Sequence, residues 1–98
     1  MPFARLSPTA RAEFDALIER LQAGPVAEAL ALIRAIDAGL ERIEAYPELG
    51  RPLPGGFRQF TLARTSYSIV YRDLGSSVEI VAFAHASRRP GYWRSRLS

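Results

Sequence analysis

The sequence contains no cysteine and no lysine, and it has one histidine, His85, and one tryptophan, Trp93, in 98 residues. The lack of cysteine excludes a disulfide framework, a thiolate zinc site and a cysteine nucleophile. A single histidine excludes an all-histidine metal site. The lack of lysine excludes the GxxxxGK[ST] phosphate-binding loop. We therefore expect neither a metal nor a cofactor.

Long apolar runs are also missing. No stretch approaches the ~18 apolar residues that a membrane span needs, and the N-terminus lacks the apolar core of a secretion signal. The composition, with 48% hydrophobic and 23% charged residues, is that of a globular protein. We expect a single cytoplasmic domain over residues 1–98 that makes no contact with membranes.

The charges are unevenly distributed along the chain. All 13 basic residues are arginine. Residues 1–50 hold 5 Arg against 8 Asp and Glu, a net charge of −3, whereas residues 51–98 hold 8 Arg against 2 acids, a net charge of +6. This asymmetry favours a polyanion or an acidic protein as the partner of the basic half.

The first half of the chain has the pattern of two helices. In residues 3–6, apolar and other residues alternate as they do in a short strand, and Ser7-Pro8 is typical of a helix start. An apolar stripe with helical spacing follows, formed by Phe14, Leu17, Ile18 and Leu21. Gly24-Pro25 ends this helix, and a second stripe follows up to Tyr46-Pro47, formed by Val26, Leu30, Ile33, Ile36, Leu40 and Ile43. The short link predicts an antiparallel pair of helices.

The second half has the period of strands. Residues 47–56 hold six of the 14 Gly and Pro residues and are predicted to form an ordered loop. Alternation then predicts strands over 57–62, 67–72 and 78–84, with a turn at 73–77 and a short helix or tail over 86–98. The predicted fold class is α+β, in the order β-α-α-β-β-β, with the helical pair covering one face of a mainly antiparallel sheet.

Candidate functional residues are arginines and aromatic residues rather than a catalytic motif. The sequence has no GxGxxG, HExxH or GxSxG motif. The basic and aromatic residues of the second half are Arg58, Arg64, Arg72, His85, Arg88, Arg89, Tyr92, Trp93, Arg94 and Arg96. Arginine binds phosphate and carboxylate in a bidentate manner and stacks on rings, so this set fits nucleic acid or a protein interface. The alternative is that both rings pack against the sheet while the arginines are solvated.

His85 could serve as a general base or acid. A lone histidine at a strand end is more commonly a structural hydrogen-bonding residue, and Asp73 and Glu79 are the only acids after residue 48. No matched proton-transfer pair is visible in the sequence.

Several short motifs, taken in order, resemble the RelE/ParE superfamily of bacterial type II toxins, and the ParE branch most closely. They are residues 46–51 (YPELGR) after the helical pair, the strand 67–72 (YSIVYR), and the strand 78–85 (VEIVAFAH), which runs into Arg88-Arg89 and Tyr92-Trp93. The similarity extends from about Arg5 to Arg96 and implies the corresponding fold.

The resemblance implies a toxin that is neutralised by a ParD-like antitoxin folding onto the helical pair. The residues that it suggests for antitoxin binding are Phe14, Leu17, Leu21, Leu30 and Ile33. ParE-like members are associated with poisoning DNA gyrase, and the residues suggested for target binding are Arg58, Arg88, Arg89, Tyr92, Trp93, Arg94 and Arg96.

RelE-like members instead cut mRNA on the ribosome, and the matching positions here are Arg64, Arg72, His85 and Tyr92. The lysines that RelE members use have no counterpart in this chain, which favours the ParE reading. Three hypotheses follow, namely a gyrase-binding toxin without chemistry of its own, a ribosome-dependent endoribonuclease, and an inert relative that binds only its partner.

Overall fold

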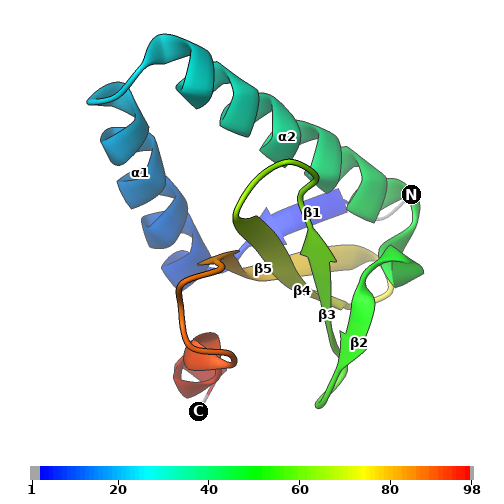
Figure 1. Ribbon diagram of the computed structural model, residues 1–98. Coiled ribbons are helices and arrows are strands. Elements are labelled where there is room, and N and C mark those ends of the chain that lie inside the picture. Colours follow the sequence, from blue (N-terminus) through cyan, green and yellow to red (C-terminus); the bar gives the residue numbers. More distant parts are fainter. Residues whose placement is uncertain (1–2, 98) are drawn as a thin grey trace.

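A strand, two helices and four further strands follow one another along the chain in a computed structural model that describes residues 3–97 (Figure 1). The elements are β1 (Phe3–Leu6), α1 (Pro8–Gln22), α2 (Val26–Ala45), the 3₁₀ helix η1 (Pro47–Leu49), β2 (Arg51–Leu53), β3 (Phe57–Thr61), β4 (Tyr67–Asp73), β5 (Ser77–His85) and the 3₁₀ helix η2 (Tyr92–Leu97). The α+β class and the predicted helical pair are confirmed. In residues 3–97, neither α1 nor α2 has the length and apolar character needed to cross a bilayer.

The strands form one sheet in the order β1-β5-β4-β3-β2. The neighbours from β2 to β5 are antiparallel, and β1 runs parallel to β5. Because β1 has four residues, it pairs with β5 only from Ser77 to Ile80. Among residues 3–97, no strand therefore lies beside the second half of β5 on that side.

The two helices cover one face of the sheet, which we call the helix-covered face. Ser7 begins α1 as predicted, since its Oγ accepts a hydrogen bond from the Ala10 N–H at 3.1 Å. The core on this face consists of Ala10, Leu17, Ile36, Ile43, Leu62, Ile69, Tyr71, Val78, Ile80 and Phe83. Gly39 lets α2 approach the sheet closely, because a Cβ there would lie 2.5 Å from Leu62 Cδ2.

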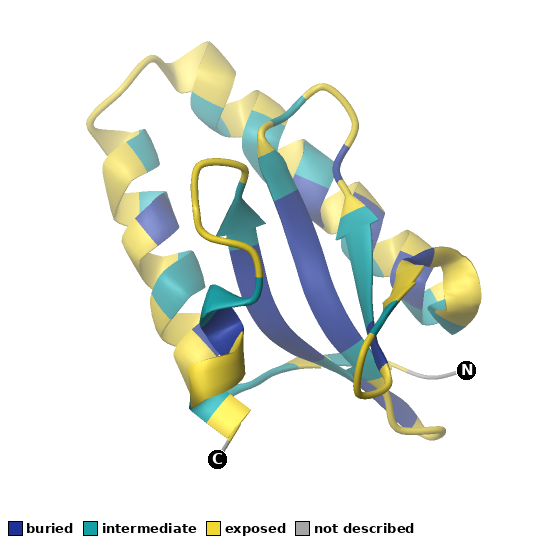
Figure 2. Cartoon of the chain, turned by 60° about the horizontal axis from the view of Figure 1, so that its bottom comes forward, coloured by how far each residue is buried: buried dark blue, intermediate teal, exposed yellow. Residues whose placement is uncertain are grey.

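The opposite face, which we call the open face, is covered only in part. The end of the chain turns onto it, and Trp93 of η2 packs with Phe57, Val70, Val81 and Ala82 in a second cluster. Figure 2 shows buried β4 and β5 in the middle of the molecule, with the outer surfaces of both helices exposed. The segment that the sequence left open as a helix or a tail is therefore a short 3₁₀ helix that contributes to the core.

The prediction of a loop over residues 47–56 was incomplete, because this segment contains η1 and the edge strand β2. Two side chains from the sheet hold it in place. The Tyr71 hydroxyl donates to the Pro47 carbonyl at 2.6 Å and accepts from the Gly50 N–H at 2.8 Å. Arg58 donates to the Glu48 and Gly50 carbonyls. These partners are distant in sequence, so local turn signals did not reveal the strand.

The predicted apolar stripe of α2 is buried only in its second half. Ile36 and Ile43 are 1% and 0% exposed, whereas Val26 and Leu30 are 73% and 45% exposed. The first turns of α2 lie beyond the strands, beside the end of α1 (Figure 1). The position of the sheet, rather than the helical period, decides which part of the stripe is covered.

Candidate functional site: a basic pocket on the open face

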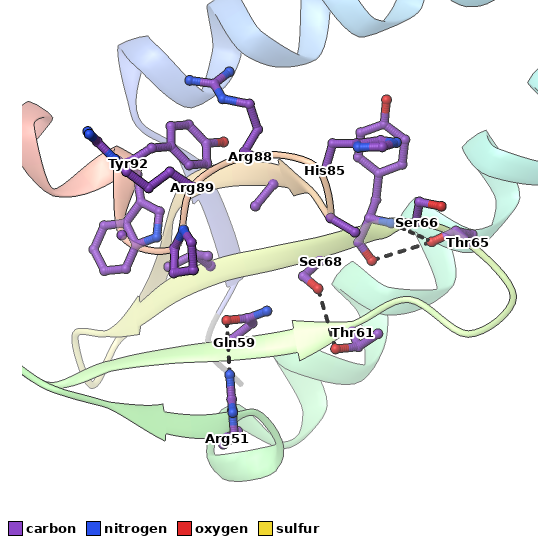
Figure 3. A pocket seen from close by; sticks show the side chains of 17 residues that line it. Arg51, Gln59, Thr61, Thr65, Ser66, Ser68, His85, Arg88, Arg89 and Tyr92 are labelled. Carbon is purple, nitrogen blue, oxygen red and sulfur yellow. Dashed lines mark hydrogen bonds between the residues drawn. The ribbon is translucent and has the colours of Figure 1, made fainter.

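A pocket of about 370 Å³, which we call the basic pocket, lies on the open face where the start of β4 pairs with the end of β5 (Figure 3). Its floor is hollow because the facing side chains are small. Ser68 of β4 is paired with Ala84 of β5, and Val70 is paired with Ala82. The segment after β5, with Pro90 and Trp93, forms one wall.

The basic pocket is lined by cations and hydroxyl groups. Arg51 comes from β2, His85 ends β5, and Arg88 and Arg89 follow on the next loop. Figure 3 shows Arg51 and Gln59 extending toward one another, and Arg51 Nη2 donates to Gln59 Oε1 at 3.4 Å. None of the described residues that line the pocket is Asp or Glu. The pocket is therefore electropositive and suited to an anionic ligand.

His85 is held in one orientation by its neighbours. Its Nδ1 accepts a hydrogen bond from the Ser87 N–H at 3.0 Å and lies 2.8 Å from Ser87 Oγ. The ring meets Tyr67 edge-on, with the centroids 4.9 Å apart. Because Nδ1 is already an acceptor, a neutral His85 carries its proton on Nε2. The imidazole can thus donate to a ligand, but its basic nitrogen is occupied.

Tyr92 takes part in a hydrogen-bond network with Glu13 of α1. Its hydroxyl donates to Glu13 Oε2 at 2.6 Å, and Arg96 Nη2 donates to the same oxygen at 3.0 Å. Burial, together with the hydrogen bond to Glu13, raises the pKa of Tyr92 to about 12. Burial alone would raise the pKa of Glu13, but hydrogen bonds from Arg96, Tyr92 and the Phe83 N–H outweigh it, so the pKa of Glu13 is lowered.

This network closes the half of the β5 edge that β1 does not reach. The Phe83 N–H donates to Glu13 Oε1 at 2.7 Å, and the Val81 carbonyl accepts from Arg96 Nη1 at 3.0 Å. Two side chains thus take the place of a neighbouring strand, which protects an otherwise unpaired edge. Arg96 is engaged here, and the hydrogen bond to Glu13 raises the pKa of its guanidinium.

The four positions suggested for ribonuclease chemistry are not brought together. Of these, the basic pocket contains only His85 and Tyr92. Arg72 lies at the other end of β4, roughly 16 Å from Tyr67 at ~3.3 Å per residue, and pairs with Glu79 at 2.7 Å. Arg64 lies in the loop after β3, with a φ of 65°. Within residues 3–97, no three metal-binding side chains of Asp, Glu or His come together either.

The residues suggested for target binding divide into accessible and engaged groups. Arg88 and Arg89 are exposed at the rim of the basic pocket. Trp93 is 3% exposed and packs against Phe57, so the structure places its ring in the core. Arg94 stacks over Trp93 at 4.4 Å and donates to the Pro54 carbonyl, and Arg58 holds the segment before β2.

Arg51, Gln59 and Ser68 were missed by the sequence reasoning. Arg51 sits among prolines and glycines, and no local signal marked it as part of a strand beside Gln59. The pairing of β2 with β3 brings the two side chains together, and that pairing depends on the whole sheet.

A second cavity of about 900 Å³, which we call the helix groove, lies between the two helices and the loop after β3. Leu21, Leu32 and Ala35 supply apolar surface to it. Its lining includes Thr65, Ser66, Tyr67 and His85, which also line the basic pocket, so the two cavities are adjacent.

Of the residues suggested for antitoxin binding, Leu21 lines the helix groove. Leu30 is 45% exposed, and Ile33 is half-buried. Leu17 belongs to the core at 2% exposure, and Phe14 packs against Phe83 with the ring centroids 5.4 Å apart. Leu17 is therefore not an accessible contact residue.

Residues 4–90 match the protein family described as the ParE toxin of type II toxin–antitoxin systems, parDE. The fold is similar to a solved structure from P. aeruginosa described as a chromosomal ParDE TA system, with a TM-score of 0.71 and 24% sequence identity over 87% of this chain and 96% of that chain. Curated protein sequences give no significant match.

Proposed function

Because this chain belongs to the family of ParE toxins of type II toxin–antitoxin systems, we propose that it acts by binding DNA gyrase, without chemistry of its own. The surface that we assign to the target is the rim of the basic pocket, with Arg88 and Arg89 at its centre. We further propose that a cognate ParD-like antitoxin neutralises the toxin in the cytoplasm by occupying the helix groove.

The observation that supports binding over catalysis is the state of the two groups available for proton transfer. The basic nitrogen of His85 is occupied by the Ser87 N–H, and the Tyr92 hydroxyl is bound to Glu13 with its pKa raised to about 12. General acid–base catalysis is most effective when the pKa lies near the working pH. Arg88 and Arg89, which are exposed at the rim of the pocket, are suited to binding an acidic surface.

The antitoxin proposal is supported by the apolar lining of the helix groove. Leu21 and Leu32 line it, and Leu30 is exposed nearby on α2. An amphipathic segment that folds on binding could bury these side chains, as helix-in-groove recognition does. Charged residues at the rim, Glu28 and Arg34, would fix its register.

The test compares Arg88→Ala plus Arg89→Ala with a control that loses the same charge elsewhere, Arg5→Ala plus Arg42→Ala. Toxicity in cells and inhibition of purified gyrase on supercoiled plasmid are measured, together with antitoxin binding. We expect the first variant to lose toxicity and gyrase inhibition while it still binds the antitoxin, and the control to behave as wild type.

Two results would reject this proposal. Codon-phased mRNA cuts in translating cells, abolished by His85→Ala, would favour the RelE-like endoribonuclease. Equal loss of toxicity and antitoxin binding in the Arg88 and Arg89 variant would mean that these arginines face the antitoxin.

A further inference from the structure

We propose that the basic pocket binds a phosphodiester group of a nucleic-acid strand and recognises the backbone rather than the bases. This inference stands on the chemistry of the pocket and goes beyond the gyrase proposal. It assigns a ligand class to Arg51, Gln59 and Ser68, which also line the pocket.

The charged and amide groups of the lining supply hydrogen-bond donors, and its hydroxyl groups can donate as well. Arg51 cannot accept a hydrogen bond, and by donating to Gln59 Oε1 it leaves the amide nitrogen of Gln59 as the free group of that side chain. His85 presents Nε2–H because its Nδ1 is occupied. A site with surplus donors requires a ligand rich in acceptor oxygens.

The charge of the pocket is not neutralised from within. Ion pairs in residues 3–97 engage Arg11, Arg72 and Arg96, and none engages Arg51, Arg88 or Arg89. A phosphodiester supplies a negative charge and two unesterified oxygens, which the planar fork of arginine matches. The volume of about 370 Å³ lies within the range of small-molecule sites.

Stacking of bases is disfavoured because the rings of Tyr92 and Trp93 already have cationic partners, and Tyr67 packs against His85. The Arg88 guanidinium lies 3.9 Å from the centroid of Tyr92, and Arg96 lies 5.1 Å from it. Arg94 stacks on Trp93, which is 3% exposed. Proteins that bind single strands combine a positively charged groove with aromatic rings on which the bases stack. Without such stacking, affinity depends on phosphate contacts and hardly on base identity.

The first measurement is fluorescence anisotropy of labelled dT10, dA10 and the RNA U10 with the purified full-length protein. We expect dT10 and dA10 to bind with affinities within about threefold of one another. The affinity should fall with salt with a logarithmic slope near ~2, as expected for about three phosphate contacts on a single strand. DNA and RNA of equal affinity would indicate the shared backbone, and tighter RNA binding would indicate contacts to the 2′-hydroxyl.

The second measurement uses Arg51→Gln plus Arg89→Gln against the charge-matched control Arg5→Gln plus Arg42→Gln. We expect the pocket variant to bind dT10 about tenfold more weakly, with a shallower salt slope, and the control to change by about twofold or less. Circular dichroism and thermal unfolding establish that both variants are folded. Shifts of the Gln59 side-chain amide resonances on addition of dT10 to wild type would locate the contact.

Three outcomes would overturn the inference. Hexaglutamate could displace dT10 at equal charge concentration, which would identify an acidic peptide as the ligand. The control variant could lose as much affinity as the pocket variant, or dA10 and dT10 could differ by more than tenfold. Gyrase inhibition is measured separately. If the protein binds dT10 but does not inhibit gyrase, the gyrase proposal is rejected and the present inference is retained.

Discussion

The two faces of the sheet are built from the same strands but have different roles. On the helix-covered face, ten buried residues from both helices and the strands form one apolar cluster. On the open face, five buried residues form a smaller cluster, and beside it Ser68 and Ala84 leave a hollow lined by arginines. From the larger cluster we expect the first face to supply most of the stability, which leaves the second free to hold a binding site.

Alternation along β4 creates this difference. Ile69 and Tyr71 point toward the helices, and Ser68 and Val70, which alternate with them, point to the open face. Because successive side chains of a strand lie on opposite faces, one strand can contribute to a core and to a pocket. The predictions below test how far the two faces are independent.

The largest effect is expected on the helix-covered face. Ile69 is fully buried, so Ile69→Ala should lower the free energy of unfolding by about 3–4 kcal/mol through lost burial and a cavity. Trp93→Ala on the open face should cost about 2 kcal/mol, less than is usual for a buried aromatic residue, because the segment after β5 can detach. Urea unfolding gives both values.

Hydrogen exchange separates local detachment from global unfolding. Trp93→Ala should abolish protection in residues 86–97 and leave β4 protected. An equal loss of stability in the two variants, with β4 deprotected in both, would show that the two faces form one cooperative core.

The next effect concerns the segment that holds β2 at the edge of the open face. A Cβ at Gly50 would lie 2.7 Å from the Tyr71 hydroxyl oxygen and 3.1 Å from Arg58 Cβ. Gly50→Ala should therefore destabilise the protein by about 1–3 kcal/mol and displace β2. Gly56→Ala meets no atom within 4 Å, but its φ of +83° also disfavours a side chain. Comparison of the two separates steric contact from backbone strain.

Glu13 connects the two faces, and its ionisation should be visible in the pH dependence of stability. Its pKa in the folded protein is lowered from 4.5, so the stabilisation is complete above the unfolded pKa and is lost as the pH falls through the folded value. Urea unfolding from pH 2 to 6 should show this loss in wild type and a flatter profile in Glu13→Gln. At neutral pH, the variant should be less stable by about 1–3 kcal/mol.

Tyr92 should give the complementary alkaline change. Its pKa is raised from 10.0 to about 12, so its contribution is complete below pH 10 and is lost as the pH rises through about 12. Tyr92→Phe should remove this dependence, and phenolate absorbance follows the titration directly. A Tyr92 that titrates near 10 would show that its hydrogen bond to Glu13 is broken in solution.

The smallest effect is expected on the outer surface of α1, away from both faces. Arg11 and Asp15 form an exposed pair four residues apart, at 3.5 Å. Asp15→Asn should change the free energy of unfolding by less than ~0.5 kcal/mol, because exposed pairs of this kind are screened by water. A cost above 1 kcal/mol would mean that this surface has a further contact.

Local patterns were sufficient to predict the helices, their ends and four strands. Ser7-Pro8 and Gly24-Pro25 mark the bounds of α1 through capping and backbone constraints, and alternation of apolar residues marks β1 and β3 to β5. The strand β2 was not predicted because its three residues lie among prolines and are too few to show an alternation of apolar and polar side chains. The hydrogen bonds that hold its approach come from Tyr71 and Arg58, which are remote in sequence.

The sequence predicted a basic surface in the second half of the chain, but not which residues line the candidate pocket. An excess of arginine in the second half predicted an anionic partner, and Arg88 and Arg89 do lie at the pocket rim. Trp93 and Arg96 were expected in the same surface, yet one is buried and the other is paired with Glu13. Sequence shows which groups are present, and packing decides which of them remain free.

The sequence by itself determined the α+β class, the helical pair and the basic character of the second half, because these follow from periodicity and charge. Only the tertiary structure decided that β1 stops short, so that Glu13 and Arg96 close the β5 edge. It also brought Arg51 beside Gln59 and the C-terminal segment onto the open face. Such contacts join residues far apart in the chain, and their geometry depends on the register of the whole sheet.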